Sequence, residues 1–363
     1  MPTSPEPIEA VSQRLDTFLS EQLSYASALG PEAETLTRSG VSALQGGKRL
    51  RARFCLAGWR AVDALATPGS AAFDASALAV ATSLEIFHAA ALVHDDLVDN
   101  SDTRRGQPAA HRALQKAHHD ADWAGASDAF GRSGAILLGD LLVAWSDDLL
   151  EEGLEGHPFA APTRRAYAHM RRDVTIGQFL DVAEESAYTV YPDDTHAERA
   201  LRIASYKSAR YSIQQPLQIG AALAGADAGQ FDALGRFGHD VGMAFQLRDD
   251  VLGVFGDSAV TGKPVGDDLR EGKRTVLVAY ARETLSPAER DRFDVLLGDA
   301  ALDAAQIAVL QQTIVDSRAL ERTENLIADF AQRADVALAD ARVDTAALTE
   351  LRALARAATE RAA

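Results

Sequence analysis

The sequence has few cysteines, few aromatic residues and too little positive charge to balance its acids, and each shortage excludes a class of protein. Its single cysteine, Cys55, excludes a disulfide framework within the chain, and apolar neighbours predict a buried structural thiol. Aromatic residues make up only 6% of the 363 residues. The net charge of -17 argues against a general affinity for nucleic acid or anionic membrane. We therefore expect no nucleic-acid partner.

Long apolar runs are missing as well. The N-terminal residues MPTSPEPIEA lack the basic start and apolar stretch of a signal peptide. Apolar segments such as GAILLGDLLVAW are short and interrupted by Asp or Gly, so we expect no transmembrane segment. These features predict a cytoplasmic protein.

Alanine and leucine dominate, and most apolar residues recur at helical rather than alternating spacing. No Pro/Ser-rich linker divides the chain, which predicts a single all-α domain over residues 1–363, with about the first seven residues disordered and a surface loop at 120–131. The predicted helices cover 7–28, 32–44, 48–65, 75–100, 107–119, 132–153, 162–186, 196–209, 211–224, 228–255, 273–283, 286–298, 303–331 and 345–361.

A cluster of carboxylates ends the predicted helix 75–100. At about 100° per residue, Asp95, Asp96, Asp99 and His88 share one helix face within roughly 100°. Negative charge is unfavourable at a helix C-terminus, and stacked carboxylates repel one another, so a compensating cation is expected. An all-oxygen ligand set suits Mg²⁺ that also binds phosphate. The motif alone leaves an ordinary acidic surface equally open.

A second acidic cluster repeats this arrangement. The apolar helix from residue 238 leads to Asp249 and Asp250, and Asp257 follows in a loop. Two such clusters facing each other across a helical bundle could hold several Mg²⁺ ions around one diphosphate.

Basic residues lie beside both acidic clusters. Lys48 and Arg51 are three residues apart where a helix is predicted to begin, next to free helix N–H groups. Arg104 and Arg105 follow the first cluster and can bind phosphate bidentately. The remaining cations of this set are Lys207, Lys263 and Lys273. Each alone would be an ordinary surface cation, but their grouping favours a diphosphate site.

Together these motifs resemble those of the trans-isoprenyl diphosphate synthases, the polyprenyl synthase family, from about residue 44 to 275. The matching motifs are GGKRLR, H-x6-DDxxD, RRG, GD at 139–140, GQxxD at 177–181, YKS, FQxxDD and GKPxGDD. The resemblance implies an all-α fold around a deep central cavity and a homodimer. It also implies a prenyltransferase that condenses isopentenyl diphosphate with an allylic diphosphate and uses three Mg²⁺ ions.

The resemblance assigns roles by position. Asp95 and Asp99 resemble ligands of two Mg²⁺ ions with Asp96 in support, and Asp249 resembles the ligand of the third with Asp250 beside it. Residues that match those binding the allylic diphosphate are Arg104, Lys207 and Lys263, and those matching the isopentenyl diphosphate pocket are Lys48, Arg51, His88 and Arg105. Residues implied to line the reacting centre are Gln178, Asp181, Gln246 and Asp267, while Lys207, Ser208 and Gln246 could direct dipoles at a carbocation.

Two positions depart from the family pattern. Gly253 replaces the usual third Asp of the second acidic motif, which puts metal binding there in doubt, and Asp257 is a candidate to compensate. Ser208 stands where Thr is usual after the lysine, and it keeps the hydroxyl.

Product length is expected to depend on residues upstream of the first acidic motif. In the family, a bulky aromatic four or five residues before the first Asp stops growth early, and here both positions are alanine, Ala90 and Ala91. Phe87 lies about 4.5 Å deeper along the helix, close to one isoprene unit, and could form the floor. This predicts geranylgeranyl diphosphate. If Phe87 is ordinary core instead, longer polyprenyl diphosphates follow.

Two other functions remain as alternatives. A class I terpene cyclase also uses a DDxxD helix, but it needs no second diphosphate pocket and has an Asn/Ser/Glu metal motif in place of the second Asp pair. A non-catalytic partner subunit typically loses one acidic motif, and Gly253 keeps that alternative open.

Overall fold

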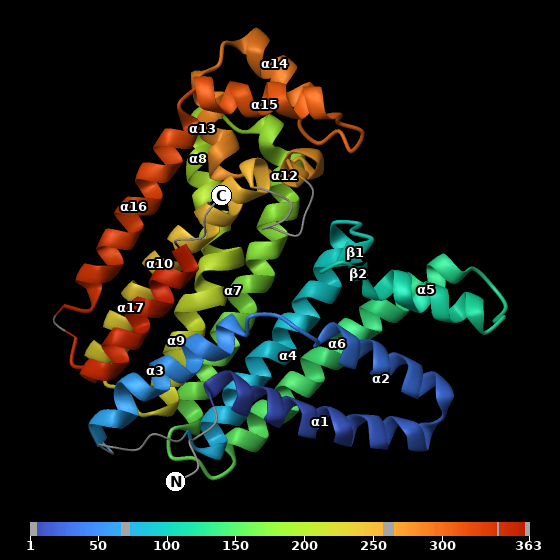
Figure 1. The fold of residues 1–363 in the computed structure, drawn as a ribbon, viewed down its shortest axis with the longest axis vertical. Helices are drawn as coiled ribbons and strands as arrows, with labels where there is room; N and C mark the ends of the chain where they lie inside the picture. The colour runs from blue at the N-terminus through green and yellow to red at the C-terminus, as the bar shows by residue number, and fades with distance from the viewer. Residues whose placement is uncertain (1–5, 67–72, 257–264, 340, 360–363) are drawn as a thin grey trace.

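The computed structural model describes residues 6–66, 73–256, 265–339 and 341–359, and nearly all of them are helical (Figure 1). The all-α prediction is confirmed; the described strands are only the two-residue pair β1 (Thr103–Arg104) and β2 (Gln107–Pro108), which are antiparallel. The helices are α1 (Pro7–Leu29), α2 (Pro31–Ala43), α3 (Leu50–Ala66), α4 (Ala75–Val98), α5 (Ala110–Asp120), α6 (Ser127–Leu154), α7 (Ala160–Ala187), η1 (Tyr188–Val190), η2 (Asp193–Thr195), α8 (His196–Ile203), η3 (Ala204–Gln214), α9 (Gln215–Leu223), α10 (Ala228–Phe255), α12 (Asp267–Glu271), α13 (Val276–Thr284), α14 (Pro287–Leu296), α15 (Ala304–Asp316), α16 (Ala319–Ala337) and α17 (Thr345–Thr359).

Local capping fixes where the two long site-bearing helices begin. The Asp74 carboxylate accepts a hydrogen bond from the Ala77 N–H at 2.6 Å and starts α4. Asp227 and Gln230 form a capping box at the start of α10, each side chain accepting from the other's backbone N–H. Such caps satisfy N–H groups that have no partner within the helix.

Helix α4 is the core helix that carries the first acidic motif. It is long and apolar enough for a membrane span, with a mean hydropathy of 1.6, but 72% of that window is buried inside the protein. Its apolar character therefore reflects burial among other helices. Cys55 on α3 is 1% exposed in the same core, which confirms the predicted buried thiol.

Several predicted boundaries were wrong. The single helix at 303–331 is two helices, α15 and α16, separated at Arg318, whose φ of 60° is left-handed and cannot continue an α-helix. The predicted loop 120–131 ends early because α6 begins at Ser127. Of the terminus predicted to be disordered, residues 1–5 lie outside the described residues, whereas Pro7 already begins α1.

The region predicted as two α-helices, 196–209 and 211–224, is one continuous helix. It consists of α8, the π-helical segment η3 and α9. Helix η3 widens over eleven residues between α8 and α9. Wide helical turns of this kind are rare and occur mostly at functional sites. Figure 1 shows α13, α14 and α15 at one end of the molecule and α16 and α17 along one side.

Candidate active site

The first acidic cluster meets side chains from two other helices. The Asp95 Oδ1 accepts a hydrogen bond from Gln178 Nε2 on α7 at 2.8 Å and lies 3.7 Å from Lys207 Nζ on η3. Lys207 also pairs with Asp181, one turn beyond Gln178. The structure thus brings the end of α4, α7 and η3 together, as the sequence motifs predict.

Asp96 and Arg104 form a buried pair beside this cluster. Asp96 is 2% exposed, and its Oδ1 accepts from Arg104 Nε at 2.8 Å. Burial raises the pKa of Asp96, and the hydrogen bond and charge of Arg104 oppose that shift. Arg104 also reaches 3.6 Å from Asp95. Asp96 therefore holds Arg104 in place beside the exposed part of the cluster.

Asp99 is a partly buried carboxylate with Asp95 close to it. It caps the C-terminus of α4, where its N–H donates to the Asp95 carbonyl at 2.8 Å. Burial, together with the Asp95 charge, raises the pKa of Asp99 to about 6, although Lys207 and Lys273 pull it down. A divalent cation between Asp95 and Asp99 would relieve this repulsion.

The second acidic cluster lies at the end of α10, close to α12. Asp250 is 6% exposed, and burial, reinforced by the charge of Asp268, raises its pKa to about 8 against a 2.7 Å hydrogen bond donated by Gln246. Lys273 lies 3.7 Å from Asp268. Burial opposes the charge of Lys273, but Asp268, Glu271 and Asp99 raise its pKa. Lys273 therefore interacts with both acidic clusters, which places both of them near one lysine.

Gly253, the departure from the family pattern, makes room for a different carboxylate. A Cβ at position 253 would lie 2.0 Å from Asp268 Oδ2 and 2.4 Å from its Cγ. The third carboxylate of this cluster thus comes from α12 instead of α10. The sequence analysis did not single out Asp268; the adjacent acid pair in GKPxGDD was the available signal.

A separate group of basic residues surrounds His88. Arg51 is 9% exposed, donates to Ser212 Oγ at 2.9 Å and stacks 4.1 Å above the Tyr211 ring. The Tyr211 hydroxyl lies 3.2 Å from His88 Nδ1. Burial, and then the charges of Arg51, Arg105, Arg104 and Arg49, hold the pKa of His88 well below its usual range. His88 is therefore neutral, and the arginines around it form a positively charged group that suits an anion.

The loop before α3 completes this basic group and corrects one prediction. Lys48 was expected on the helix but lies in the loop, because α3 begins at Leu50, and its side chain is exposed. Arg105 donates to the Gln45 carbonyl at 2.9 Å and is packed against Gly47. Arg49 and Glu85, which the sequence analysis did not single out, meet at the same loop.

The remaining predicted site residues fall into three groups. Ser208 follows Lys207 on η3 and is partly buried, and Asp267 begins α12. Lys263 and Asp257 lie outside the described residues. Phe87 is 7% exposed, and its ring meets Tyr167 and Tyr211 edge-on at centroid distances of 6.4 and 6.0 Å. On the next turn of α4, Ala90 is buried and Ala91 is partly buried.

The donor chemistry of the two acidic clusters fits Mg²⁺. Asp95, Asp99 and Asp249 offer carboxylate oxygens, and burial together with the Asp95 charge raises the pKa of Asp99, an effect that a bound cation would oppose. Within the described ranges, no three His, Cys, Asp or Glu side chains already converge as a metal cage. Mg²⁺ commonly completes its octahedron with water and substrate phosphate, so a dispersed carboxylate set is compatible with it.

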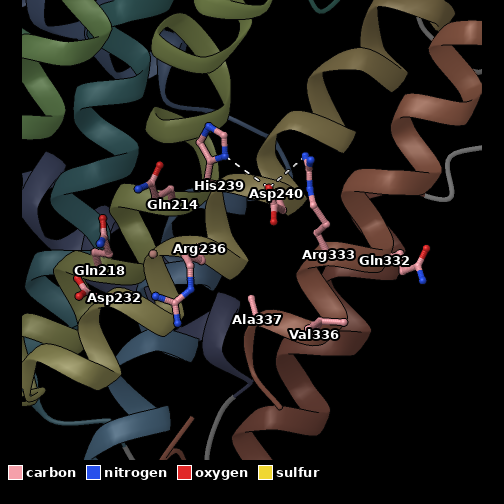
Figure 2. Close-up of a pocket in the computed structure, with 11 residues that line it drawn as sticks. Gln214, Gln218, Asp232, Arg236, His239, Asp240, Gln332, Arg333, Val336 and Ala337 are labelled. Carbon is pink, nitrogen blue, oxygen red and sulfur yellow. Dashed lines mark ion pairs between the residues drawn. The ribbon is translucent and has the colours of Figure 1, made fainter. Parts of the chain in front are cut away.

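A pocket of about 780 Å³ lies elsewhere, between α10 and α16 (Figure 2). At its edge Asp240 pairs with His239 and Arg333, each at 3.6 Å. No residue predicted for the site lines this pocket. Its residue His239 contacts the helix that carries Lys207, because His239 Nε2 is 3.1 Å from Ser205 Oγ, two residues before Lys207.

Comparison with known proteins agrees with this geometry. The profile of the polyprenyl synthetase family matches residues 33–314. The geranylfarnesyl diphosphate synthase of Aeropyrum pernix is 32% identical over 292 residues, which cover 80% of this chain and 82% of that protein. The geranylgeranyl diphosphate synthase of Mycobacterium tuberculosis is 36% identical over 63% of this chain and 59% of its own length.

Solved structures are similar over nearly the whole chain. The crystal structure of a geranylgeranyl pyrophosphate synthase from Corynebacterium glutamicum, complexed with isoprenyl diphosphate and magnesium, has a TM-score of 0.90 and 39% identity over 98% of both chains. A polyprenyl synthase from Caulobacter crescentus, complexed with calcium and isoprenyl diphosphate, has a TM-score of 0.76 and 28% identity over 98% of this chain and 96% of its own.

Proposed function

Because the chain belongs to the polyprenyl synthetase family and is a prenyltransferase that forms trans-prenyl diphosphates, we propose that its product is geranylgeranyl diphosphate. The substrates in this proposal are isopentenyl diphosphate and an allylic prenyl diphosphate. The relatives do not share one product length, since their names include geranylfarnesyl, geranylgeranyl and farnesyl diphosphate synthases. The length must therefore be argued from this chain's own residues.

The observation that supports the reaction type is the presence of two cationic groups, one among the carboxylates and one around His88, with Arg104 close to both. Arg104, Lys207 and Lys273 lie among the carboxylates, where a metal-bound diphosphate would be held. Arg51 and Arg105 surround the neutral His88. Two diphosphate positions are required for condensation of two substrates. A terpene cyclase needs only the first.

In the proposed mechanism Asp95, Asp99 and Asp249 would hold three Mg²⁺ ions with Asp96 and Asp250 in support, and Lys263 would bind the allylic diphosphate as well. When bound, Mg²⁺ would neutralise charge on the departing diphosphate. Arg104 and Lys207 orient that diphosphate for cleavage of the allylic C–O bond. Arg51, Arg105, Lys48 and His88 align isopentenyl diphosphate, whose double bond attacks the allylic carbon.

The protein's remaining task is to protect the carbocation and let a proton leave. The Ser208 hydroxyl, the Gln246 side chain and the Lys207 backbone supply dipoles at the reacting centre, and Gln178, Asp181 and Asp267 complete its polar lining. Exclusion of water prevents capture of the cation. The new allylic product forms when a proton is lost from the former isopentenyl skeleton, and the released diphosphate is the base assigned to accept it.

We assign product length to an aromatic wall below the first acidic motif. Phe87 is enclosed edge-on by Tyr167 and Tyr211. Both rings are themselves buried, so Phe87 has little freedom to swing away. Ala91, one turn above Phe87, packs against the same cluster, is only partly buried and adds no more than a methyl group, whereas Ala90 is 1% exposed and packs in a separate cluster with Leu138. This arrangement supports a stop at twenty carbons, with Phe87 as the floor.

We also propose that the enzyme is a cytoplasmic homodimer. Consecutive helices α6 and α7 are joined by the Arg171–Asp147 and Arg164–Glu151 ion pairs. Both helices nevertheless expose large apolar side chains, among them Leu137 at 60% and Phe179 at 69%. Apolar exposure on adjoining helices is typical of a surface that a second copy covers.

A product assay tests the function. The protein is incubated with Mg²⁺, labelled isopentenyl diphosphate and, separately, dimethylallyl, geranyl or farnesyl diphosphate, and the dephosphorylated products are separated by chain length. We expect the twenty-carbon product from the wild type and longer products from Phe87→Ala. Phe73→Ala, which also removes an aromatic packed against this core, is the control and should leave length unchanged. Equal product length in wild type and Phe87→Ala would rule out the floor, and no elongation with any primer would refute the function.

A further inference from the structure

The loop at residues 44–49, just before α3, adopts a backbone conformation that contacts from other parts of the protein must stabilise. Arg49 has a φ of 50°, and Gly46 and Gly47 before it also have positive φ. Glycine tolerates this region, but a side-chain-bearing residue such as Arg49 is strained there. Arg49 precedes the first turn of α3, since its carbonyl accepts the Arg53 N–H at 3.0 Å. Whatever holds Arg49 therefore also sets the position of Arg51.

Glu85 supplies that support from α4. The Glu85 side chain is 4% exposed. Its Oε1 accepts a hydrogen bond at 3.0 Å from the N–H of Ala52, which is thirty-three residues away in the sequence. Ala52 is the third residue of α3, so this N–H has no acceptor within the helix. Glu85 Oε2 lies 3.9 Å from Arg49 Nη1, and Arg49 Nη2 donates to the Leu44 carbonyl at 2.8 Å.

Glu85 is also the counter-charge of the basic group around His88. Arg49, Arg51 and Arg105 are close enough to act on His88 electrostatically, and Glu85 acts on Arg105 and on Tyr211 in the same way. Removing its charge would leave like charges facing one another in a largely buried space. The buried N–H of Ala52 would at the same time depend on a weaker acceptor.

Both carboxylate oxygens of Glu85 are thus engaged with the protein, and its side chain is almost fully buried. It is not placed to contact a substrate directly. We propose that Glu85 is a positioning residue that holds the 48–52 segment in its anion-binding form, and so determines affinity for isopentenyl diphosphate. This inference rests on the proposed function, because it assigns that substrate to the pocket around His88.

The positioning role and a purely electrostatic role of Glu85 predict opposite changes in anion affinity when Glu85 is neutralised. Replacing a carboxylate near an anion pocket with a neutral side chain should strengthen anion binding if charge alone matters. If Glu85 acts by positioning, Glu85→Gln should weaken binding even though the pocket becomes more positive. The sign of the change in affinity therefore separates the two accounts.

The experiment is calorimetric titration of isopentenyl diphosphate into Mg²⁺-free protein, with KM and kcat for both substrates measured alongside. For Glu85→Gln we expect Kd and KM for isopentenyl diphosphate to rise about tenfold or more, as expected when a charged hydrogen-bond network is broken. KM for the allylic substrate and kcat at saturation should stay within about threefold. Glu85→Asp, which retains the charge, should recover part of the affinity.

Glu184→Gln is the matched control. Its side chain is also 4% exposed and pairs with an arginine, Arg199, but on α7 and away from the loop. It should leave Kd for isopentenyl diphosphate unchanged. A Kd that is unchanged or lower in Glu85→Gln, or an equal rise in Glu184→Gln, would overturn the proposal.

A double-mutant cycle guards against general loosening of the fold. If Glu85 acts through Arg49, Glu85→Gln should have much less effect in an Arg49→Gln background than alone. Additive effects would count against the proposed route. If the wild-type protein binds no isopentenyl diphosphate at all, the assignment of the pocket fails instead, and that result is distinct from failure of the role of Glu85.

Discussion

At the scale of single residues, the charge state of His88 follows from its neighbours. It is surrounded by arginines and shielded from solvent, and both effects disfavour the imidazolium. A neutral His88 can donate one hydrogen bond and accept another, and the Tyr211 hydroxyl is its partner at Nδ1. The positive charge of the pocket therefore comes from arginine and lysine alone, and its attraction for a diphosphate should not depend on His88 titration near neutral pH.

This predicts a specific acid sensitivity. The unfolded chain protonates His88 below about pH 6.5, whereas the folded protein does not. The unfolded state then binds more protons, so stability falls as pH drops, by up to about 1.4 kcal/mol per pH unit, and the effect vanishes above pH ~6.5. His88→Asn should flatten this fall in melting temperature between about pH 7.5 and 5. Exposed His119→Asn is the control, and parallel melting curves for His88→Asn and wild type would contradict the prediction.

Residue-level prediction from sequence succeeded where one helix fixes the geometry. Asp95 and Asp99 are one turn apart, so their shared face followed from helical period alone. Asp268 and Glu85 could not be found this way. Asp268 matters because α12 brings it into the space that Gly253 leaves open, and Glu85 because α3 begins against α4. Both depend on packing between helices, which the period of one helix does not contain.

At the scale of elements, η3 is held between two helices at glycines. A Cβ at Gly177 on α7 would lie 2.4 Å from the backbone nitrogen of Lys207. A Cβ at Gly242 on α10 would lie 2.4 Å from the carbonyl oxygen of Ala209. Backbone therefore packs on backbone on both sides of the π-helical segment that presents Lys207 and Ser208. The wide helix and the two glycines form one unit that sets where Lys207 points.

Gly177→Ala adds only one methyl group, but we expect it to lower activity strongly. The added methyl must push η3 away from α7, which separates Lys207 from Asp181 and Asp95. We expect kcat/KM for the allylic substrate to fall at least about tenfold and stability to drop by about 1–3 kcal/mol from overpacking. Gly134→Ala on α6 is the control because the closest contact of its methyl would be the Cδ1 tip of the Leu114 side chain, at 2.9 Å, and not backbone. Equal kcat/KM in the two variants would show that η3 tolerates displacement.

The element boundaries show why the π-helical segment was not predicted. Residues 196–223 keep apolar positions at near-helical spacing throughout, so the sequence indicated helix correctly but not its width. The break at Arg318 was missed for a related reason. No Gly or Pro marks it, and the left-handed conformation at an arginine is set by how α15 and α16 pack.

At the scale of the whole molecule, the site and the apolar surface lie on adjoining faces of the same stretch of α7. Gln178 donates to Asp95, whereas its neighbour Phe179 is 69% exposed. Ile176 and Val182, at helical spacing from Phe179, are exposed as well, and Ile136 and Leu137 extend the apolar surface onto α6. If a second copy covers Phe179, it also stabilises the turn that presents Gln178 and Asp181.

Phe179→Asp should therefore produce a monomer and reduce activity together. A buried charge at the centre of a dimer interface is strongly unfavourable, so the molar mass from light scattering should fall by half at about micromolar concentration. KM for the allylic substrate should rise because the α7 turn is less well held. Val309→Asp, on α15 and 56% exposed, is the matched control and should change neither property. A wild-type protein that is already monomeric would refute the interface, and a monomeric variant with unchanged kinetics would show that the two faces of α7 act independently.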